Sequence, residues 1–490
     1  MDITLTGVMF LLCIFIYSTW DTFYRRRNLP PGPTPLPLVG TLLHIGRGKL
    51  VNSLMKLWDQ YGSVYTLYFG SRPVVVLCGY ETMKAALIDR GDEFGARGSL
   101  PVLEKFVQGY GISLSNGERW KLIRTFTVRT LKSFGFGKKS IEEKIQTEAQ
   151  CIVDEFRKSN GQPFDPDKKL MDAFSNALCA VVFGDRFEYK DERFIQLLAI
   201  AEESFHLASS SWGQLQSILP TIMNYVPGPH QRMNTLSQEL ADFINERVKA
   251  SQETLDLSSP RHFIDSFLIK MEEEKNNPQT EFNLRNLLMT THNLFLAGIE
   301  TVATTVRYGM LILLKYPEIQ AKIHKEIDQV IGQDRAPNFE DRMAMHYTQA
   351  VIHEVQRFCD VLPLNLPHMV TRDIQFRGYQ IPKGTEIYPL LCTVHRDPKQ
   401  FSSPWKFDPN HFLDDNGNFK KNDALMPFSA GKRICPGENL ARMEIFIFLT
   451  KILQNFKLTS PTDFTEADIA PKMAGFLNAP INYKLSFIPR

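Results

Sequence analysis

The sequence predicts a mainly α-helical protein with small β-sheets, an α+β fold, preceded by one membrane-spanning helix. Three observations support this prediction. Long helical patterns recur along the chain, strand patterns are few and short, and an uncharged apolar run lies close to the N-terminus. With 490 residues, of which 43% are hydrophobic, the chain can bury a large core.

The apolar run ITLTGVMFLLCIFIYSTW, residues 3–20, contains no charged side chain. As a helix it would be roughly 27 Å long, close to the thickness of a bilayer core. Asp2 precedes the run and three arginines follow at 25–27, which favours a retained anchor over a cleaved signal peptide or a buried core helix. We therefore predict a membrane anchor over 1–27, with the rest of the chain in the cytosol.

Five prolines among residues 28–37 predict a stiff, non-helical hinge after the anchor. Residues 38–490 then form a single cytosolic domain. Two strands joined by a turn are predicted in 63–79 and again in 374–390, and a single strand in 481–489. Helical patterns cover 139–158, 236–250, 284–315, 317–330, 341–359 and 437–455.

Charge and cysteine usage exclude several classes of protein. The 56 basic and 54 acidic residues nearly cancel, which argues against a nucleic-acid-binding protein. The seven cysteines are scattered and include no C-x-x-C pair. A zinc site or a disulfide scaffold is therefore not expected, and the domain is expected in a reducing compartment.

The segment that surrounds Cys435, MPFSAGKRICPGENLARMEI, predicts a ligand site. Pro436 and Glu438 are typical of a helix start, so Cys435 is expected at a helix N-terminus, where a thiolate is favoured over a thiol. Gly431 and Gly437 can take positive φ and allow close approach of a flat ligand. Arg433 supplies a cation suited to a carboxylate. These features together indicate haem held by cysteine.

The pattern Phe428-x-x-Gly431-x-Arg433-x-Cys435-x-Gly437 resembles the haem-binding loop of the cytochrome P450 family of haem-thiolate monooxygenases. The resemblance extends over essentially the whole chain, and is strongest to the vertebrate microsomal group that metabolises drugs, fatty acids and steroids. It implies the P450 fold, haem b as cofactor and Cys435 as the axial ligand of the iron, with Phe428 and Gly437 beside the haem.

The segment HEVQR, residues 353–357, lacks the second histidine of a zinc-protease motif. Glu354 and Arg357 share a helix face and can pair, and such a pair alone would be read as a surface ion pair. In the resembled family, E-x-x-R is a buried structural pair that is tied to a third residue. That third position is His411 here, where the family often has arginine.

Residues 294–305, LFLAGIETVATT, place Glu300 and Thr301 within an apolar helix. A threonine hydroxyl often bonds to the carbonyl four residues earlier, and Gly298 would ease a bend. The pattern alone also fits an ordinary helix that tolerates these residues. The resemblance implies instead that Glu300 and Thr301 are catalytic and deliver protons during oxygen activation.

The helix predicted in GERWKLIRTFTVR, residues 117–129, places Trp120 and Arg124 on one face. Haem carries two propionates that need donors when buried. The resemblance assigns these contacts to Arg97, Trp120, Arg124, His368 and Arg433. Arg119, Lys121 and Arg129 of the same helix are expected to face solvent, where they would contribute to a basic patch for an electron donor.

The resemblance also implies partners and a substrate pocket. The partners are an NADPH-dependent flavoprotein reductase, with cytochrome b5 as a second candidate, together with O2, a lipophilic substrate and the endoplasmic reticulum membrane. An apolar pocket discriminates weakly among lipophilic molecules, so the substrate stays open among xenobiotics, fatty acids and steroids. The pocket residues that it implies are Ile112, Leu114, Phe205, Ala297, Leu362, Leu366 and Phe476.

Two alternatives remain at this point. One keeps the fold but isomerises or dehydrates peroxides without a reductase, and Glu300 and Thr301 argue against it because that reaction needs no proton delivery to dioxygen. The other is a non-enzymatic haem protein that senses gas or carries haem.

Overall fold

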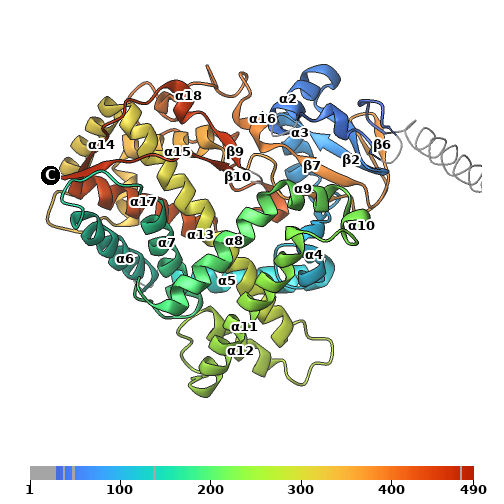
Figure 1. Ribbon diagram of the computed structural model, residues 1–490, viewed down its shortest axis with the longest axis horizontal. Coiled ribbons are helices and arrows are strands. Elements are labelled where there is room, and N and C mark those ends of the chain that lie inside the picture. The colour runs from blue at the N-terminus through green and yellow to red at the C-terminus, as the bar shows by residue number, and fades with distance from the viewer. Residues whose placement is uncertain (1–28, 37–38, 47–49, 136–139, 475–476) are drawn as a thin grey trace, which may run out of the picture.

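The computed structural model describes all residues except 1–28, 37–38, 47–49, 136–139 and 475–476 (Figure 1). The predicted anchor and Phe476 lie outside the described residues. The described part of the hinge, residues 29–36, forms no helix. It is hydrogen-bonded to strand β1 (Val64–Phe69), where Thr66 N donates to Pro31 O at 2.8 Å. A Cβ at Gly32 would lie 2.0 Å from Thr66 O. This part of the hinge is therefore attached to the domain and is not a free spacer.

Helices dominate the described chain, so the prediction of a mainly helical α+β fold is confirmed. The longer α-helices are α2 (Leu50–Tyr61), α4 (Pro101–Val107), α5 (Gly117–Gly135), α6 (Ser140–Arg157), α7 (Asp167–Val182), α8 (Glu192–Ser209), α9 (Ser211–Ile218), α11 (Arg232–Glu253), α12 (Phe263–Glu273), α13 (Leu284–Lys315), α14 (Pro317–Val330), α15 (His346–Cys359) and α17 (Glu438–Asn455). The short helices and turns are α3 (Tyr80–Met83), α10 (Pro220–Met223), α16 (Leu391–His395), α18 (Glu466–Ile469), η1 (Leu42–His44), η2 (Lys84–Asp89), η3 (Pro229–Gln231), η4 (Phe339–Met343), η5 (Pro409–Phe412) and η6 (Gly431–Arg433).

Helix α13 runs through the middle of the helical part of the molecule (Figure 1). Its N-terminus is capped by Asn283, whose side chain accepts from Asn286 N at 3.0 Å. It packs against α7, α11, α15 and α17. Helices α6, α7, α13, α14, α15 and α17 enclose the largest apolar cluster. Among the residues described, only α13 has the length and composition of a membrane span, and 72% of its most apolar window is buried. It is therefore a core helix.

Small sheets lie beside the helical core. The largest has the strand order β1-β2-β7-β4-β3, in which β2 and β7 are parallel and the other pairs antiparallel. Three two-stranded pairs, β5–β6, β8–β11 and β9–β10, complete the set. The remaining strand bounds are β2 (Arg72–Leu77), β3 (Ala96–Arg97), β4 (His368–Met369), β5 (Ile374–Phe376), β6 (Tyr379–Ile381), β7 (Glu386–Pro389), β8 (Phe456–Thr459), β9 (Lys472–Ala474), β10 (Leu477–Ala479) and β11 (Ser486–Pro489).

Several predicted elements have other bounds in the structure. The strand predicted over 481–489 begins only at Ser486 (β11), and the helix predicted over 236–250 spans Arg232–Glu253 (α11). The helix predicted over 341–359 begins only at His346, because the Glu326 carboxylate accepts from Tyr347 N (2.9 Å) and Thr348 N (2.7 Å) and caps α15 there. The hairpin predicted over 374–390 ends at Ile381. The last strand of that segment, β7, pairs with β2 instead, a long-range contact that a local pattern does not contain.

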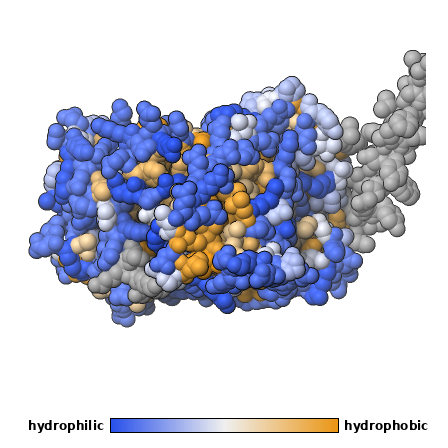
Figure 2. All heavy atoms as spheres, turned by 90° about the horizontal axis from the view of Figure 1, so that it is seen from below, coloured by the Kyte–Doolittle hydropathy of each residue, from blue (hydrophilic) through white to orange (hydrophobic). Residues whose placement is uncertain are grey.

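One face of the molecule is mainly hydrophilic, with hydrophobic residues gathered near its middle (Figure 2). Large apolar side chains are also exposed on α9 and α10, among them Trp212 (38%) and Ile222 (57%), and at Leu43 of η1 (75%). Arg72 of β2 donates to Ser217 O at 3.1 Å. The exposed apolar residues of α9 therefore lie next to the sheet to which the hinge is bound.

Candidate functional site

An interior cavity of about 270 Å³ lies between α13, α5 and the segment that leads into α17. Residues far apart in the sequence meet here, and they include Cys435 and Thr301. The predicted site residues that line the cavity are Arg97, Ile112, Trp120, Arg124, Ala297, Thr301, Leu362, Leu366, Phe428, Arg433, Cys435 and Gly437.

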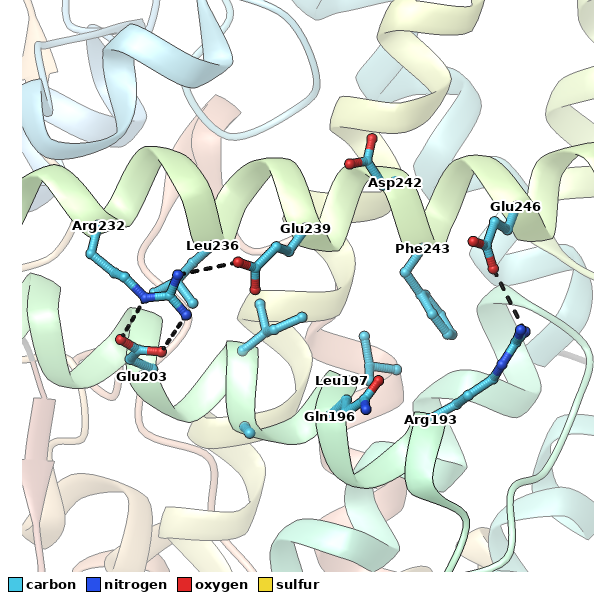
Figure 3. Close-up of a pocket in the computed structure, with 12 residues that line it drawn as sticks. Arg193, Gln196, Leu197, Glu203, Arg232, Leu236, Glu239, Asp242, Phe243 and Glu246 are labelled. Carbon is cyan, nitrogen blue, oxygen red and sulfur yellow. Dashed lines mark hydrogen bonds and ion pairs between the residues drawn. The ribbon is translucent and has the colours of Figure 1, made fainter.

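A second hollow, a groove of about 550 Å³, lies at the surface between α8 and α11 (Figure 3). Most of its charged side chains pair with one another: Arg232 contacts Glu203 (3.0 Å) and Glu239 (3.2 Å), and Arg193 lies 3.6 Å from Glu246. It contains no predicted site residue. We therefore assign the chemistry to the interior cavity.

The cysteine loop is shaped by close backbone contacts. Cys435 N donates to Phe428 O at 2.9 Å. Gly431 has φ +71, and a Cβ there would lie 1.8 Å from Leu87 O of η2. The expected positive φ is present at Gly431 but not at Gly437, whose φ is −91. The approach to η2 by itself requires glycine at Gly431, which does not line the cavity, whereas Gly437 lines it and lies directly before α17.

Burial raises the pKa of the Cys435 thiol above its ordinary value. The backbone N–H of Gly437 and the charges of Arg124 and Arg97 lower this pKa, but they do not outweigh burial. The helix N-terminus therefore acts in the predicted direction, through the Gly437 N–H, but burial raises the pKa of the thiol by more. The cost of burying the charge exceeds the stabilisation from the helix terminus and the arginines, so the thiolate needs a further positive charge at the sulfur.

Three buried or half-buried arginines gather beside the sulfur. Arg433 donates to Gly95 O (2.8 Å) and Ser115 O (2.9 Å), and its guanidinium lies 3.7 Å from the ring centroid of Trp120. Arg97 donates to Ser113 O, and Arg124 to Ile434 O. Within the described part of the chain none of the three pairs with a carboxylate. Burial and mutual repulsion lower the pKa of Arg433 to about 8 and that of Arg97 to about 9.

Buried donors without partners lie in the same region. Trp120 Nε1 and Arg433 Nη1 are buried and bond to no described residue, and both side chains line the cavity. His368 does not line the cavity, but its Nε2 also lacks a partner while its Nδ1 contacts Phe94 O at 2.7 Å. Unsatisfied buried donors are costly. Uncompensated cations and free donors around a cavity that contains a cysteine fit a group with carboxylates and a thiolate-binding metal, as haem has.

Glu354 and Arg357 form a fully buried ion pair on α15, with Arg357 Nη2 2.6 Å from Glu354 Oε1. The guanidinium also donates to the carbonyls of His395 (2.9 Å), Pro404 (2.7 Å) and Lys406 (2.9 Å). The pair therefore connects α15 with the segment 395–406, and it does not line the cavity.

His411 of η5 completes this network. Its Nδ1 lies 3.2 Å from Glu354 Oε2, and its Nε2 contacts Ser402 O. Burial lowers the pKa of His411, but the hydrogen bond and charge of Glu354 raise it more, so the net shift is upward. His411 thus occupies the place predicted for the third partner, as a donor to Glu354.

The two predicted catalytic residues of α13 lie on different faces. Thr301 lines the cavity and donates to Ala297 O at 2.9 Å. Glu300 does not line the cavity, and it accepts from Thr304 Oγ1 at 3.4 Å. Helix α13 is continuous through Gly298, where a Cβ would lie 2.9 Å from Leu178 Cδ2. Gly298 therefore allows close packing of α7 on α13.

The predicted substrate residues are only partly brought together. Ile112, Ala297, Leu362 and Leu366 line the cavity, whereas Leu114 and Phe205 do not. Leu114 follows Ile112 by two residues in a loop, and Phe205 lies on α8, which contributes nothing to the lining.

Several polar residues that line the cavity were not predicted from the sequence. Asn293 lines it and accepts from Ile112 N and Ser113 N, both at 3.1 Å, which ties α13 to the loop before α5. Glu444 of α17 also lines it, and burial raises the pKa of this carboxyl to about 8. A polar side chain within an apolar helical run was the available signal in both cases.

Comparison with known proteins agrees with this geometry. The family model for cytochrome P450 matches residues 30–487. The chain is 52% identical to cytochrome P450 2G1 of Rattus norvegicus, over 98% of this chain and 97% of the relative. It is 50% identical to cytochrome P450 2A13 of Homo sapiens over the same shares. Cytochrome P450 2C23 of Rattus norvegicus is 48% identical over 99% of both chains.

The chain belongs to the cytochrome P450 family, and the relatives named above, 2G1, 2A13 and 2C23, all carry the family number 2. It therefore binds haem and is an oxidoreductase of the monooxygenase class.

Proposed function

We propose that this protein is a membrane-bound monooxygenase that inserts one oxygen atom of O2 into lipophilic small molecules, with electrons from an NADPH-dependent flavoprotein reductase. The observation that carries the proposal is that Cys435 and Thr301 line one cavity together with Arg97, Arg124 and Arg433, which form no ion pair with a carboxylate of the described chain. Haem, when bound there, supplies the activation of O2 and the transfer of one oxygen atom to the substrate.

Cys435 would bind the haem iron, whose charge compensates the burial that disfavours the thiolate. Arg97, Arg124 and Arg433 would pair with the two propionates, and Trp120 Nε1 would donate to them. His368, which lies outside the lining, donates through Nδ1 to Phe94 O, so in the neutral ring its Nε2 is an acceptor, and it would donate to a propionate only after the ring is protonated. Phe428 and Gly437 border the same cavity.

The Thr301 hydroxyl lies at the cavity and donates its hydrogen bond to Ala297 O. Its oxygen can accept a proton, so Thr301 would pass protons to the cavity. Glu300, on the neighbouring face of α13, would replenish that proton. The side chains of Ile112, Ala297, Leu362 and Leu366 would exclude water and hold an apolar substrate, which favours xenobiotics, fatty acids or steroids.

The membrane and redox parts of the proposal rest on other features. The uncharged run 3–20, followed by arginines, supports an endoplasmic reticulum anchor with the domain in the cytosol. Lys121 and Arg129 of α5 are exposed and can contribute to a basic surface for the reductase or cytochrome b5. Arg119 pairs with Glu281 at 2.7 Å and Lys121 with Glu118 at 2.6 Å, so both contribute less than Arg129, which forms no ion pair with a described residue.

The test combines spectra and turnover of the purified, haem-loaded protein. We expect a thiolate-type Soret band in the reduced, CO-bound form, and we expect it to be lost in Cys435→Ala. The matched control is Cys151→Ala, a partly exposed cysteine outside the cavity. With reductase and a panel of lipophilic compounds, NADPH consumption should yield oxygenated products.

A thiolate-type band in Cys435→Ala would contradict the assignment of the ligand. A thiolate-type band without reductase-dependent turnover, but with rearrangement of added peroxides, would favour a reductase-independent isomerase. Normal spectra with neither activity would favour a haem sensor.

A further inference from the structure

The α4–α5 loop (residues 108–116) is bound to the first turns of α13 by two asparagine side chains of that helix. Gly111 N donates to Asn286 Oδ1, and the N–H groups of the next two residues donate to Asn293 Oδ1, all at 3.1 Å. The two asparagines are seven residues apart, so they lie two turns apart on one face of α13. Three consecutive backbone N–H groups of the loop are therefore bound by the helix.

Gly111 permits this close approach of the loop to the helix. Its φ is +77, in the left-handed region that glycine adopts without strain. A Cβ at this position would lie 2.9 Å from Met289 O, a backbone atom of α13. The loop backbone therefore lies directly against α13, and a displacement of the loop along the helix would break all three hydrogen bonds.

Asn286 is itself held in place, although it does not line the cavity. Its side chain is fully buried, and its Nδ2 donates to Glu281 O at 2.7 Å and to Glu281 Oε2 at 3.1 Å. The same carboxylate pairs with Arg119 of α5 at 2.7 Å, and Arg119 also donates to Gly109 O at 3.2 Å. Because the amide nitrogen is bound on this side, the amide oxygen is directed at Gly111.

The position of the loop on α13 decides which of its side chains line the cavity. Ile112 and Ser113 line it, whereas Leu114, the next residue, does not. Ser113 O also accepts from Arg97 Nε at 3.3 Å, and Arg97 itself lines the cavity. The loop is therefore bound on both sides of its cavity-lining residues, and a shift along α13 would change the lining.

We propose that Asn286 is a positioning residue for substrate selectivity, because it holds the α4–α5 loop in one register on α13. In this register Ile112 and Ser113, and not Leu114, are presented to the substrate. The proposal rests on the proposed monooxygenase function, since it concerns the substrate of that reaction. The register itself can be measured without turnover.

The first experiment measures hydrogen–deuterium exchange of the full-length, haem-loaded protein without substrate. Asn286→Ala removes the acceptor of Gly111 N, so we expect exchange in peptides that cover the α4–α5 loop to be about 2–10-fold faster than in the wild type. Peptides from α14 should keep their rates, which excludes a general loosening of the fold. The matched control is Asn277→Ala, because Asn277 is exposed and its Oδ1 accepts from Gln279 N at 3.1 Å, outside the loop.

Two further variants separate the hydrogen bond from the volume of the side chain. Asn286→Leu keeps the volume but removes the acceptor, so the loop should exchange as fast as in Asn286→Ala. Asn286→Asp combined with Glu281→Gln reverses donor and acceptor at the contact between these residues and keeps an acceptor for Gly111 N, so exchange should stay slow. Wild-type loop exchange in Asn286→Ala and Asn286→Leu would overturn the proposal. If Asn286→Leu does not retain haem, Asn286→Ala alone decides.

The second experiment follows the haem absorption spectrum during titration with a panel of lipophilic compounds. Leu114→Ala should change the Kd by less than about 2-fold, whereas Ile112→Ala should raise it about 10-fold, because only Ile112 lines the cavity. In the Asn286→Ala background we expect Leu114→Ala to change the Kd and Ile112→Ala to lose part of its effect, because the loop no longer keeps one register.

The outcomes distinguish this proposal from the proposed function. An equal effect of Leu114→Ala in both backgrounds would overturn the role of Asn286 in selectivity. Failure of the wild type to oxidise any compound with reductase would instead contradict the proposed function. The exchange rates would still show whether Asn286 fixes the loop on α13.

Discussion

Arg357 and Glu354 form a fully buried ion pair, with 2.6 Å between Nη2 and Oε1, one helical turn apart on α15. A pair at this spacing would be a weak surface contact if it faced solvent. Here three backbone carbonyls and Asp408 N, which donates to Glu354 Oε1 at 2.8 Å, satisfy the remaining bonding capacity. The pair therefore joins α15 to the segment 395–411.

We expect Glu354→Gln to lower the free energy of unfolding by about 3–5 kcal/mol, because it leaves the Arg357 charge buried without its carboxylate. Urea denaturation followed by circular dichroism measures this loss. Glu273→Gln, an exposed partner of Lys270, should change stability by less than about 0.5 kcal/mol. Equal stabilities of Glu354→Gln and the wild type would show that the pair is energetically neutral.

The contact of His411 with Glu354 predicts a pH dependence of stability. Glu354 raises the pKa of His411 above its ordinary 6.5 in the fold, against the effect of burial. The contribution to the free energy of unfolding is therefore complete below pH 6.5 and is lost as the pH rises through the folded pKa. Unfolding midpoints from pH 6 to 8 should fall less steeply in His411→Gln than in the wild type, and parallel profiles would contradict this role.

Arg433→Gln should weaken haem retention, because it removes a buried cation that no carboxylate of the described chain compensates. Loss of one charge-assisted hydrogen bond, about 1.5–3 kcal/mol, corresponds to haem dissociation at least 10-fold faster. Transfer of haem to an excess of a haem-free globin measures the rate. Arg372→Gln, an exposed arginine paired with Glu93, is the control and should retain the wild-type rate. If both variants lose haem equally slowly, Arg433 has no part in binding it.

Thr301→Ala should retain haem but uncouple NADPH consumption from product formation. The hydroxyl lies at the cavity, and its removal deletes one group that can pass a proton. A general acid or base typically raises the rate of its step by about 10²–10⁴-fold. Water can replace part of this effect, so we expect the rate of product formation to fall by about 100-fold or less. Product and hydrogen peroxide are measured per NADPH. Thr301→Ser should keep coupling, and full coupling in Thr301→Ala would leave only a structural role.

Deletion of residues 1–27 should release much of the protein from membranes and leave haem binding intact. The cavity is built from residues after the hinge, so the anchor is not needed for it. Weak attachment should persist through exposed apolar residues such as Leu43, Trp212 and Ile222. Sedimentation with vesicles, with and without the deletion, measures the difference. Loss of haem on truncation would contradict the assignment of 1–27 as an anchor only.

Local sequence patterns were sufficient to predict most of the helices and the ligand chemistry of the loop around Cys435. The helices over 284–315 and 317–330 have the bounds predicted from their periodicity, because helix formation depends mainly on neighbours three and four residues apart. The spacing of Gly431, Arg433 and Cys435 likewise indicated a haem ligand, since all of these residues lie within one short segment.

The sequence by itself determined the family, the helical class and twelve of the residues that line the cavity. Only the tertiary structure decided that Thr301 lines the cavity while Glu300 lies outside it, as the acceptor of a hydrogen bond from Thr304. It also decided that burial outweighs the helix terminus at Cys435. Both depend on which distant segments pack against a side chain and exclude water from it, and that is a property of long-range contacts.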